Sequence, residues 1–276
     1  MYDGSGAPPV TLDLGVRGER IQALGSLPGA SAACEIDASG LAVAPGFIDT
    51  HTHSDVASLL GDEHESVTTA DVRQGVTTEI CGNCGFSPFP FIGSQQADLE
   101  RLVGGLFGPA SRVWADLAAY SAGVRRAGLF ANLGPLVGHG SLRAGVIGFA
   151  NRPLQPDELQ TVIALLEGSL DQGALGLSSG LVYAPGFSAP TEELVELCRV
   201  VGRRRRPYTT HMRGETSMLA TSLDEALRIG RESGAAVHIS HHKAAGKANW
   251  GRTEETLAMI DLAREHGQDV TLDMYP

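Results

Sequence analysis

The first residues that could do chemistry are His51 and His53, a His-x-His pair that directly follows a short apolar segment at residues 47–50. This segment is typical of a β-strand, and side chains two residues apart on a strand point to the same side. Both imidazoles can therefore present a ring nitrogen to one point, as metal-binding histidines do. Taken alone, the stretch also fits two surface histidines near a turn, so the remaining donors decide the interpretation.

Further sulfur and nitrogen donors follow later apolar segments that we expect to be strands. They are Cys84, His139, His211 and the adjacent pair His241 and His242. In a barrel of alternating strands and helices, the carboxyl ends of the strands meet at one rim. Thiolate and imidazole ligands that converge there are typical of a zinc site. The sequence therefore predicts a metal centre at the strand ends.

Cys84 shares a Cys-x-x-Cys motif with Cys81, and three interpretations of this motif compete. A zinc ribbon requires a second closely spaced cysteine pair, and the four cysteines of the chain provide none. A thioredoxin-like redox pair sits at the start of a helix, whereas Gly82-Asn83 predicts a turn. A single ligand cysteine, Cys84, with Cys81 as its neighbour fits the barrel rim best.

From residue 41 onward, apolar segments alternate with amphipathic ones, which is the pattern of a parallel sheet with helical crossovers. The predicted strands cover about residues 47–50, 77–81, 130–137, 174–178, 207–211, 236–240 and 270–274. The predicted fold class is α/β, a TIM-type (β/α)8 barrel that is incomplete at about seven strands. Because no helix follows the seventh strand, we expect the chain to be a fragment.

Four helices are predicted from apolar side chains spaced three and four residues apart. One begins at Pro156 and ends before Gly173, one follows Thr191 as its N-cap, and two cover about residues 218–232 and 254–266. The only basic run, residues 203–206, falls where the second helix should end, and cations complement the helix dipole there.

Residues 1–43 have a different pattern. Short alternating segments at residues 10–16 and 21–24 flank a turn and indicate a small all-β unit. Its hairpins are too few to close a sandwich. We therefore predict a partial β-sandwich at residues 1–43, followed by the truncated barrel at residues 44–276.

The composition argues against several classes of partner. The 276 residues carry a formal net charge of −11 without a basic stripe, which disfavours nucleic acid and anionic membranes. We identify no signal-like start and no apolar run of about 18 residues. Four cysteines in a chain of this length do not indicate a disulfide scaffold, so the expected location is the cytoplasm.

Five motifs together give the sequence a specific resemblance. They are Pro45-Gly46-Phe47-Ile48-Asp49-Thr50-His51-Thr52-His53, Gly82-Asn83-Cys84-Gly85, Thr210-His211-Met212-Arg213, Ile239-Ser240-His241-His242-Lys243 and Asp273-Met274-Tyr275-Pro276. In this order they resemble the N-acyl-D-amino-acid deacylases (D-aminoacylases) of the amidohydrolase superfamily. The His-x-His opening is common to that superfamily, whereas Gly-Asn-Cys-Gly with Ser-His-His-Lys is much narrower. Members are typically far longer, and the remainder would hold the eighth strand and the rest of the sandwich.

The resemblance implies a zinc-binding role for five residues. Cys84, His211 and His241 would hold one tightly bound zinc ion. His51 and His53, with Cys84 as a bridge, would form a second and weaker metal position. The resemblance thereby selects His241 over its neighbour as the ligand.

The resemblance also implies a small-molecule substrate, an N-acyl-D-amino acid. Lys243 and Tyr275 would bind its α-carboxylate, a task that suits an ammonium and a phenol donor. Lys243 lies two residues beyond His241, so strand geometry points both side chains into the same pocket. His139 resembles a family segment at the rim, where substrate contact and a loop or supporting role are both compatible with the sequence.

The implied reaction is zinc-dependent hydrolysis of the amide bond to a carboxylate and a free D-amino acid. Zinc lowers the pKa of bound water towards about 7 and polarises the carbonyl, while a carboxylate base moves the proton. Asp49, Asp55 and Asp273 are candidates for the base by position, but the resemblance places it on the eighth strand, beyond Pro276. We therefore expect residues 1–276 alone not to turn over.

Two alternatives stay open. One is a cyclic-amide hydrolase of the same superfamily, but such enzymes bridge two metals with a carboxylated lysine at the end of strand four, and residues 174–180 contain no lysine. The other is a non-catalytic, truncated metal-binding remnant, whose unfinished barrel edge would favour association. His64, His238 and His266 are expected to be surface or structural histidines.

Overall fold

The structure is a computed structural model that describes residues 1–60, 69–108 and 112–275. The chain divides into two compact units, Met1–Phe47 and Ile48–Pro276. His64, expected to be a surface or structural residue, lies outside the described residues.

The first unit contains an antiparallel hairpin of β1 (Asp13–Arg17) and β2 (Arg20–Gly25). The hairpin turns at Gly18, whose φ of 59° is a conformation that glycine adopts without strain. The apolar side chains of Val16 and Ile21 are exposed on this hairpin. The partial sandwich at residues 1–43 stays a prediction.

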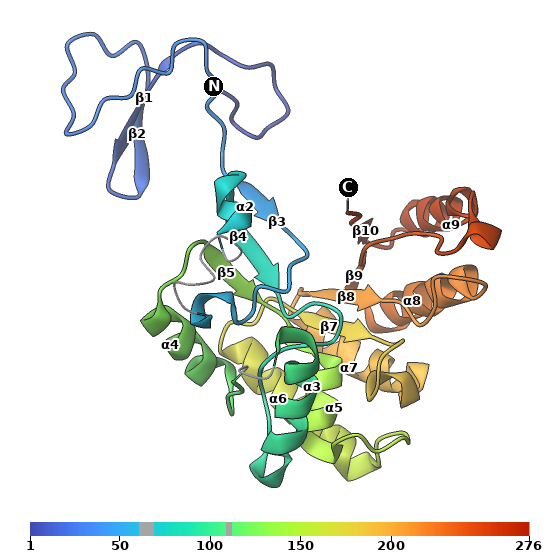
Figure 1. Ribbon diagram of the computed structural model, residues 1–276. Coiled ribbons are helices and arrows are strands. Elements are labelled where there is room, and N and C mark those ends of the chain that lie inside the picture. The colour runs from blue at the N-terminus through green and yellow to red at the C-terminus, as the bar shows by residue number, and fades with distance from the viewer. Residues whose placement is uncertain (61–68, 109–111, 276) are drawn as a thin grey trace. The chain divides into compact units, whose positions relative to one another are not determined.

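The second unit is built around parallel strands in two sheets (Figure 1). The sheet order is β3-β4-β5 in one and β10-β9-β8-β7-β6 in the other. The strands are β3 (Phe47–Asp49), β4 (Val76–Cys81), β5 (Asn132–Pro135), β6 (Val137–Gly138), β7 (Leu177–Gly180), β8 (Pro207–His211), β9 (Ala236–Ile239) and β10 (Val270–Leu272).

The two sheets are one partial barrel wall, because the predicted third strand crosses between them. Its first part, β5, pairs with β4, and its second part, β6, pairs with β7. At the junction, Leu136 N donates to Cys81 O at 2.9 Å, and Val137 N donates to Gly176 O at 2.9 Å. The predicted third strand is therefore present but interrupted. The predicted fourth strand begins later than expected, at Leu177 rather than at residue 174.

Helices flank this wall and connect its strands (Figure 1). They are α2 (Ala70–Arg73), α3 (Gln96–Phe107), α4 (Leu117–Ala127), α5 (His139–Ile147), α6 (Pro156–Asp171), α7 (Thr191–Arg203), α8 (Leu219–Ser233) and α9 (Thr253–Glu265). The four predicted helices correspond to α6–α9. Single 3-10 turns occur at Ala57–Leu59, Gly93–Gln95, Gly186–Ser188 and Lys247–Asn249.

The main core lies between the sheet and α6–α8. Leu177, Tyr208 and Ile239 on the strands are fully buried against helix residues such as Leu197 and Leu223. Burying one such side chain contributes roughly 1.5–3 kcal/mol, so this layer fixes where the strand ends lie.

Two features of the helices differ from expectation. α5 has no counterpart among the predicted helices because its first seven residues are buried, and a helix buried all round shows no amphipathic period. Thr191 does not cap α7. Pro190 occupies the N-cap position, and the Thr191 hydroxyl instead donates to Glu225 Oε1 at 2.8 Å.

The basic run at residues 203–206 behaves as predicted. α7 ends at Arg203, and Arg204 donates to Asp171 of α6 at 3.0 Å. Within the residues that the structure describes, we find no helix with the length and apolar character needed to cross a membrane.

Candidate metal centre

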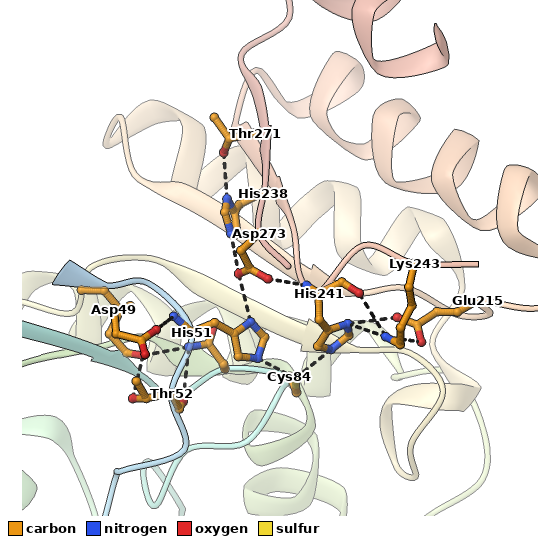
Figure 2. Close-up of polar contacts among 12 residues, drawn as sticks. Asp49, His51, Thr52, Cys84, Glu215, His238, His241, Lys243, Thr271 and Asp273 are labelled. Carbon is orange, nitrogen blue, oxygen red and sulfur yellow. Dashed lines mark hydrogen bonds and ion pairs between the residues drawn. The ribbon is translucent and has the colours of Figure 1, made fainter. Parts of the chain in front are cut away.

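Cys84 lies between two histidines that come from distant parts of the chain (Figure 2). Its Sγ atom is 3.4 Å from His51 Nε2 and 3.6 Å from His241 Nε2. His51 follows β3, Cys84 lies in the loop after β4, and His241 follows β9. The carboxyl ends of parallel strands thus bring together a thiol and two imidazoles, as expected for a barrel rim.

A second group of donors adjoins the first and shares His241. It consists of His211, the last residue of β8, together with Glu215 and His241. In each of the two groups the donor atoms all lie within 4.8 Å of one another, close enough to surround one ion. Glu215 was not predicted as a site residue.

The remaining predicted site residues line the same cavity, which has a volume of about 800 Å³. His53 contributes to its wall, with its ring centroid 5.6 Å from that of His51, but it belongs to neither donor group. Lys243 and Tyr275 lie side by side, with Lys243 Nζ 5.4 Å from the centre of the Tyr275 ring. The cavity also carries an apolar wall formed by Phe86, Leu102, Leu106, Phe149 and Val182.

The backbone is strained at two of the donor residues. Cys84 and His241 have φ angles of 55° and 39°, in a region that non-glycine residues rarely adopt. Such conformations cost about 1–3 kcal/mol each and cluster at functional sites, where the surroundings hold them in place. The strain at both residues therefore supports a functional role for this pair.

Gly180 is expected to be essential for the position of Cys84. A Cβ atom at Gly180 would lie 2.1 Å from Cys84 O, a clash with backbone that cannot rotate away. We expect Gly180→Ala to cost about 1–3 kcal/mol of unfolding free energy, as overpacking does, and to weaken metal binding.

A matched control is Gly168→Ala in α6, where nothing lies within 4 Å of the added Cβ. Since alanine is favoured over glycine in a helix, this variant should gain up to about 1 kcal/mol. Urea unfolding and a zinc titration of both variants test the pair of expectations, and an unchanged zinc affinity in Gly180→Ala would contradict the claim about Cys84.

The charge states of the donors fit a cation. Burial, together with the nearby rings of His51 and His241, lowers the pKa of His53 to about 4. Burial and His241 similarly lower the pKa of His211 to about 4. These imidazoles are therefore neutral at pH 7 and keep a lone pair for a metal.

Cys84 needs a cation to become a thiolate. Burial raises the pKa of its thiol to about 12, and the carboxylates of Asp273 and Glu215 act in the same direction. A bound divalent ion would supply the positive charge that this mixture of thiol, imidazole and carboxylate lacks. The donor chemistry thus fits a metal of the zinc type.

The three aspartates considered as bases have different surroundings. Asp273 Oδ2 lies 2.8 Å from His238 Nε2 and 3.1 Å from His51 Nδ1. Burial opposes its ionisation, but these hydrogen bonds prevail and hold its pKa well below the usual value. Asp49 accepts the backbone N–H of His51 at 3.0 Å.

Asp55 is fully buried beside the backbone of Gly82 and the thiol of Cys81. Burial raises the pKa of its carboxyl group to about 7. It does not line the cavity that contains Cys84 and His211.

Two other histidines at the strand ends face away from this cavity. His139 begins α5 and is fully buried, with Nε2 2.9 Å from Glu193 Oε1. His242 Nε2 lies 2.9 Å from Thr256 Oγ1, and His242 does not line the cavity. The structure therefore distinguishes His241, which contacts Cys84, from His242 by their contacts.

The sequence interpretation did not single out Glu215 or His238 as members of the site. The sequence signal for Glu215 was its position four residues after His211. His238 lies on β9, three residues before His241. His238 takes part through Asp273, to which it is hydrogen-bonded.

The partial barrel and its rim of donors define a class of protein, the metal-dependent hydrolase barrels. The chain belongs to the amidohydrolase family, whose model matches residues 35–256. It is 41% identical over its whole length to the D-aminoacylase of Alcaligenes xylosoxydans xylosoxydans and covers 55% of that protein. The chain thus spans about half the length of the curated relatives it matches.

Solved structures give the same result. The N-acyl-D-glutamate deacylase from Bordetella bronchiseptica, complexed with zinc and a phosphonate mimic of the tetrahedral intermediate, matches with a TM-score of 0.89 and 40% identity over 99% of this chain and 56% of that one. A D-aminoacylase structure, described by its binuclear metal centre with one-metal activation and second-metal attenuation, matches with a TM-score of 0.87 and 42% identity over the same shares. The resemblance to the N-acyl-D-amino-acid deacylases is confirmed.

Proposed function

We propose that the protein hydrolyses the amide bond of N-acyl-D-amino acids to a carboxylate and a free D-amino acid. The observation that carries this proposal is a rim at which Cys84 and His211 belong to two donor groups that share His241, in a chain that is 40–42% identical to deacylases of known structure. Its substrate is a small molecule, for which the cavity of about 800 Å³ has room. From its composition we place the protein in the cytoplasm.

Cys84, His211 and His241 would hold the tightly bound zinc ion of this enzyme. His51 and His53, with Cys84 as a bridge, would form the weaker position. When bound, the metal polarises the amide carbonyl and acidifies the attacking water. The protein's part is to hold neutral imidazoles at the rim, which the burial of His53 and His211 supports.

Lys243 and Tyr275 would bind the α-carboxylate of the substrate. Support comes from their common place in the cavity wall and from the donors they carry. Lys243 Nζ now lies 2.6 Å from Glu215 Oε2, so its ammonium group is already oriented by one carboxylate. The apolar wall opposite would face the acyl group or the side chain of the substrate.

The general base would be an aspartate beyond Pro276. Two of the aspartates within the described residues, Asp49 and Asp273, are hydrogen-bonded to histidines of the site, and Asp55 lies outside the cavity. We therefore expect residues 1–276, expressed alone, to bind zinc and to leave N-acetyl-D-leucine intact. Free D-leucine released above the buffer rate would contradict the assignment of the base.

The activity itself is tested with the protein expressed from its whole gene. It should release the amino acid from at least one of N-acetyl-D-leucine, N-acetyl-D-glutamate and N-acetyl-D-aspartate, and from none of the L-enantiomers. His241→Ala should lose this activity, whereas His242→Ala should keep most of it because His242 contacts Thr256 and does not line the cavity. Hydrolysis of a hydantoin without hydrolysis of any N-acyl-D-amino acid would contradict the proposal and favour a cyclic amidase.

A further inference from the structure

The ring of His241 is held at both of its nitrogen atoms (Figure 2). Nε2 lies 3.6 Å from Cys84 Sγ, and Nδ1 lies 3.0 Å from Glu215 Oε1. A neutral imidazole carries a proton on only one nitrogen, and the partner of one nitrogen decides which of the two is free. Lys243 Nζ also lies 3.0 Å from Nδ1. An ammonium group cannot accept a hydrogen bond, so of these two neighbours only Glu215 can accept a proton carried on Nδ1.

We infer that Glu215 is a positioning residue for the metal centre. When Nε2 binds the metal, the proton of His241 must be on Nδ1, and the Glu215 carboxylate 3.0 Å away is placed to accept it. The inference rests on the proposed metal centre and adds to it a role for a residue that the sequence did not single out. Carboxylates in this position orient the ring and increase its strength as a ligand.

The carboxylate is itself fixed in place. Its second oxygen, Oε2, lies 2.6 Å from Lys243 Nζ, and the same ammonium group donates to His241 O at 3.1 Å. The Glu215 side chain is only 11% exposed, so water competes little for these contacts. Glu215 thus connects the metal ligand His241 to Lys243, the proposed partner of the substrate carboxylate.

The other histidine beside Cys84 has the same arrangement. His51 Nε2 lies 3.4 Å from Cys84 Sγ, and His51 Nδ1 lies 3.1 Å from Asp273 Oδ2. Each imidazole that flanks the thiol therefore has a carboxylate on its far nitrogen. The same arrangement in the loops after two different strands argues that the contact of Glu215 with His241 serves the site.

Glu215 also lies close enough to His211 and His241 to be a metal ligand in its own right. Oε2 is in the ion pair with Lys243, and Oε1 lies 3.0 Å from His241 Nδ1 on the far side of the ring from Cys84, which favours action through the ring. Spectroscopy separates the two roles, because loss of a ligand changes the coordination of the ion whereas loss of a positioning contact weakens binding without changing the ligand set.

The test is a Co²⁺ titration of the full chain and of Glu215→Gln, followed by the sulfur-to-cobalt charge-transfer band and the visible d–d bands. We expect the dissociation constant of the tight site to rise by roughly 10–100-fold, the usual effect of losing such a partner. The bands at saturation should be unchanged. Equal dissociation constants, or d–d bands that report a different coordination number, would overturn the inference.

Glu225→Gln is the matched control. Glu225 is a comparably buried glutamate in an ion pair, 2.9 Å from Arg213, and it contacts no imidazole. Both variants should lower the melting temperature of the metal-free chain, but only Glu215→Gln should change the Co²⁺ dissociation constant. A merely structural Glu215 would give the same constant as the control.

The failure of this inference differs from the failure of the proposed function. If the unmodified chain binds no Co²⁺ through Cys84, the metal centre and the role of Glu215 are both overturned. If the unmodified chain and Glu215→Gln bind Co²⁺ equally well with the same sulfur band, the metal centre stands and only the role of Glu215 is overturned.

Discussion

Replacing Cys84 with alanine is expected to abolish high-affinity zinc binding. Cys84 Sγ is the donor that lies between His51 and His241, and it belongs to both proposed metal positions. Loss of a ligand should cost more than the roughly 100-fold that loss of a ligand's hydrogen-bond partner costs at most. Zinc content after dialysis and a calorimetric titration measure the effect.

Cys81→Ala is the control for this prediction. Cys81 is fully buried, and its Sγ atom lies 3.9 Å from Tyr120 OH rather than at the rim. Its loss should lower the unfolding free energy, since it removes a core side chain, and should leave zinc stoichiometry unchanged. The assignment is wrong if zinc survives in Cys84→Ala and disappears in Cys81→Ala.

Glu193→Gln is expected to have the largest effect on stability. Both Glu193 oxygens lie 2.7 Å from Arg143 Nη1, and Oε1 lies 2.9 Å from His139 Nε2, with all three side chains buried. Removing one charge from a buried pair leaves the other uncompensated and costs about 3–5 kcal/mol. Denaturant unfolding at pH 7 provides the measurement.

Glu196→Gln on the same helix is the control. Glu196 pairs with Arg199 at the surface, where both side chains are more than 40% exposed. Surface pairs contribute about 0–1 kcal/mol, so this variant should unfold close to the unmodified chain. Equal destabilisation by the two substitutions would contradict the importance of the buried pair.

Glu193 should also make the unfolding free energy depend on pH. Burial opposes ionisation of Glu193, but hydrogen bonds and charge from His139 and Arg143 prevail and lower its pKa from 4.5 to about 2. A carboxyl group with a lowered pKa stabilises the folded state fully above its unfolded pKa, and this stability is lost as the pH falls towards the folded value. The difference in unfolding free energy between the unmodified chain and Glu193→Gln should therefore be constant above about pH 5 and shrink towards pH 2. If the difference in unfolding free energy does not change with pH, the ionised Glu193 carboxylate is not its source.

Much of the barrel and part of the site could be predicted because both depend on local patterns. Apolar strands alternate with amphipathic helices such as α6 and α8, and the strand ends carry His51, Cys84 and His241. Since parallel strands end at one rim, residues far apart in sequence could be expected to meet. The choice of His241 over His242 needed the family resemblance, and in the structure His241 contacts Cys84 whereas His242 contacts Thr256.

The remaining features depend on contacts that no local pattern encodes. Glu215 and Asp273 reach the histidines only through the folded arrangement of the loops after β8 and β10. α5 is buried on most sides, so it lacks the alternation of apolar and polar residues that marks a surface helix. The positive φ angles of Cys84 and His241 are likewise not indicated by their residue types, since non-glycine residues rarely adopt them.

Anomalous diffraction at the zinc edge, from crystals of the zinc-loaded chain, tests most directly whether Cys84, His211 and His241 hold one zinc ion. We expect an anomalous peak about 2.3 Å from Cys84 Sγ and about 2.0–2.1 Å from one ring nitrogen of each histidine. A zinc peak bound elsewhere, or one at this rim without a bond to Cys84, would contradict it.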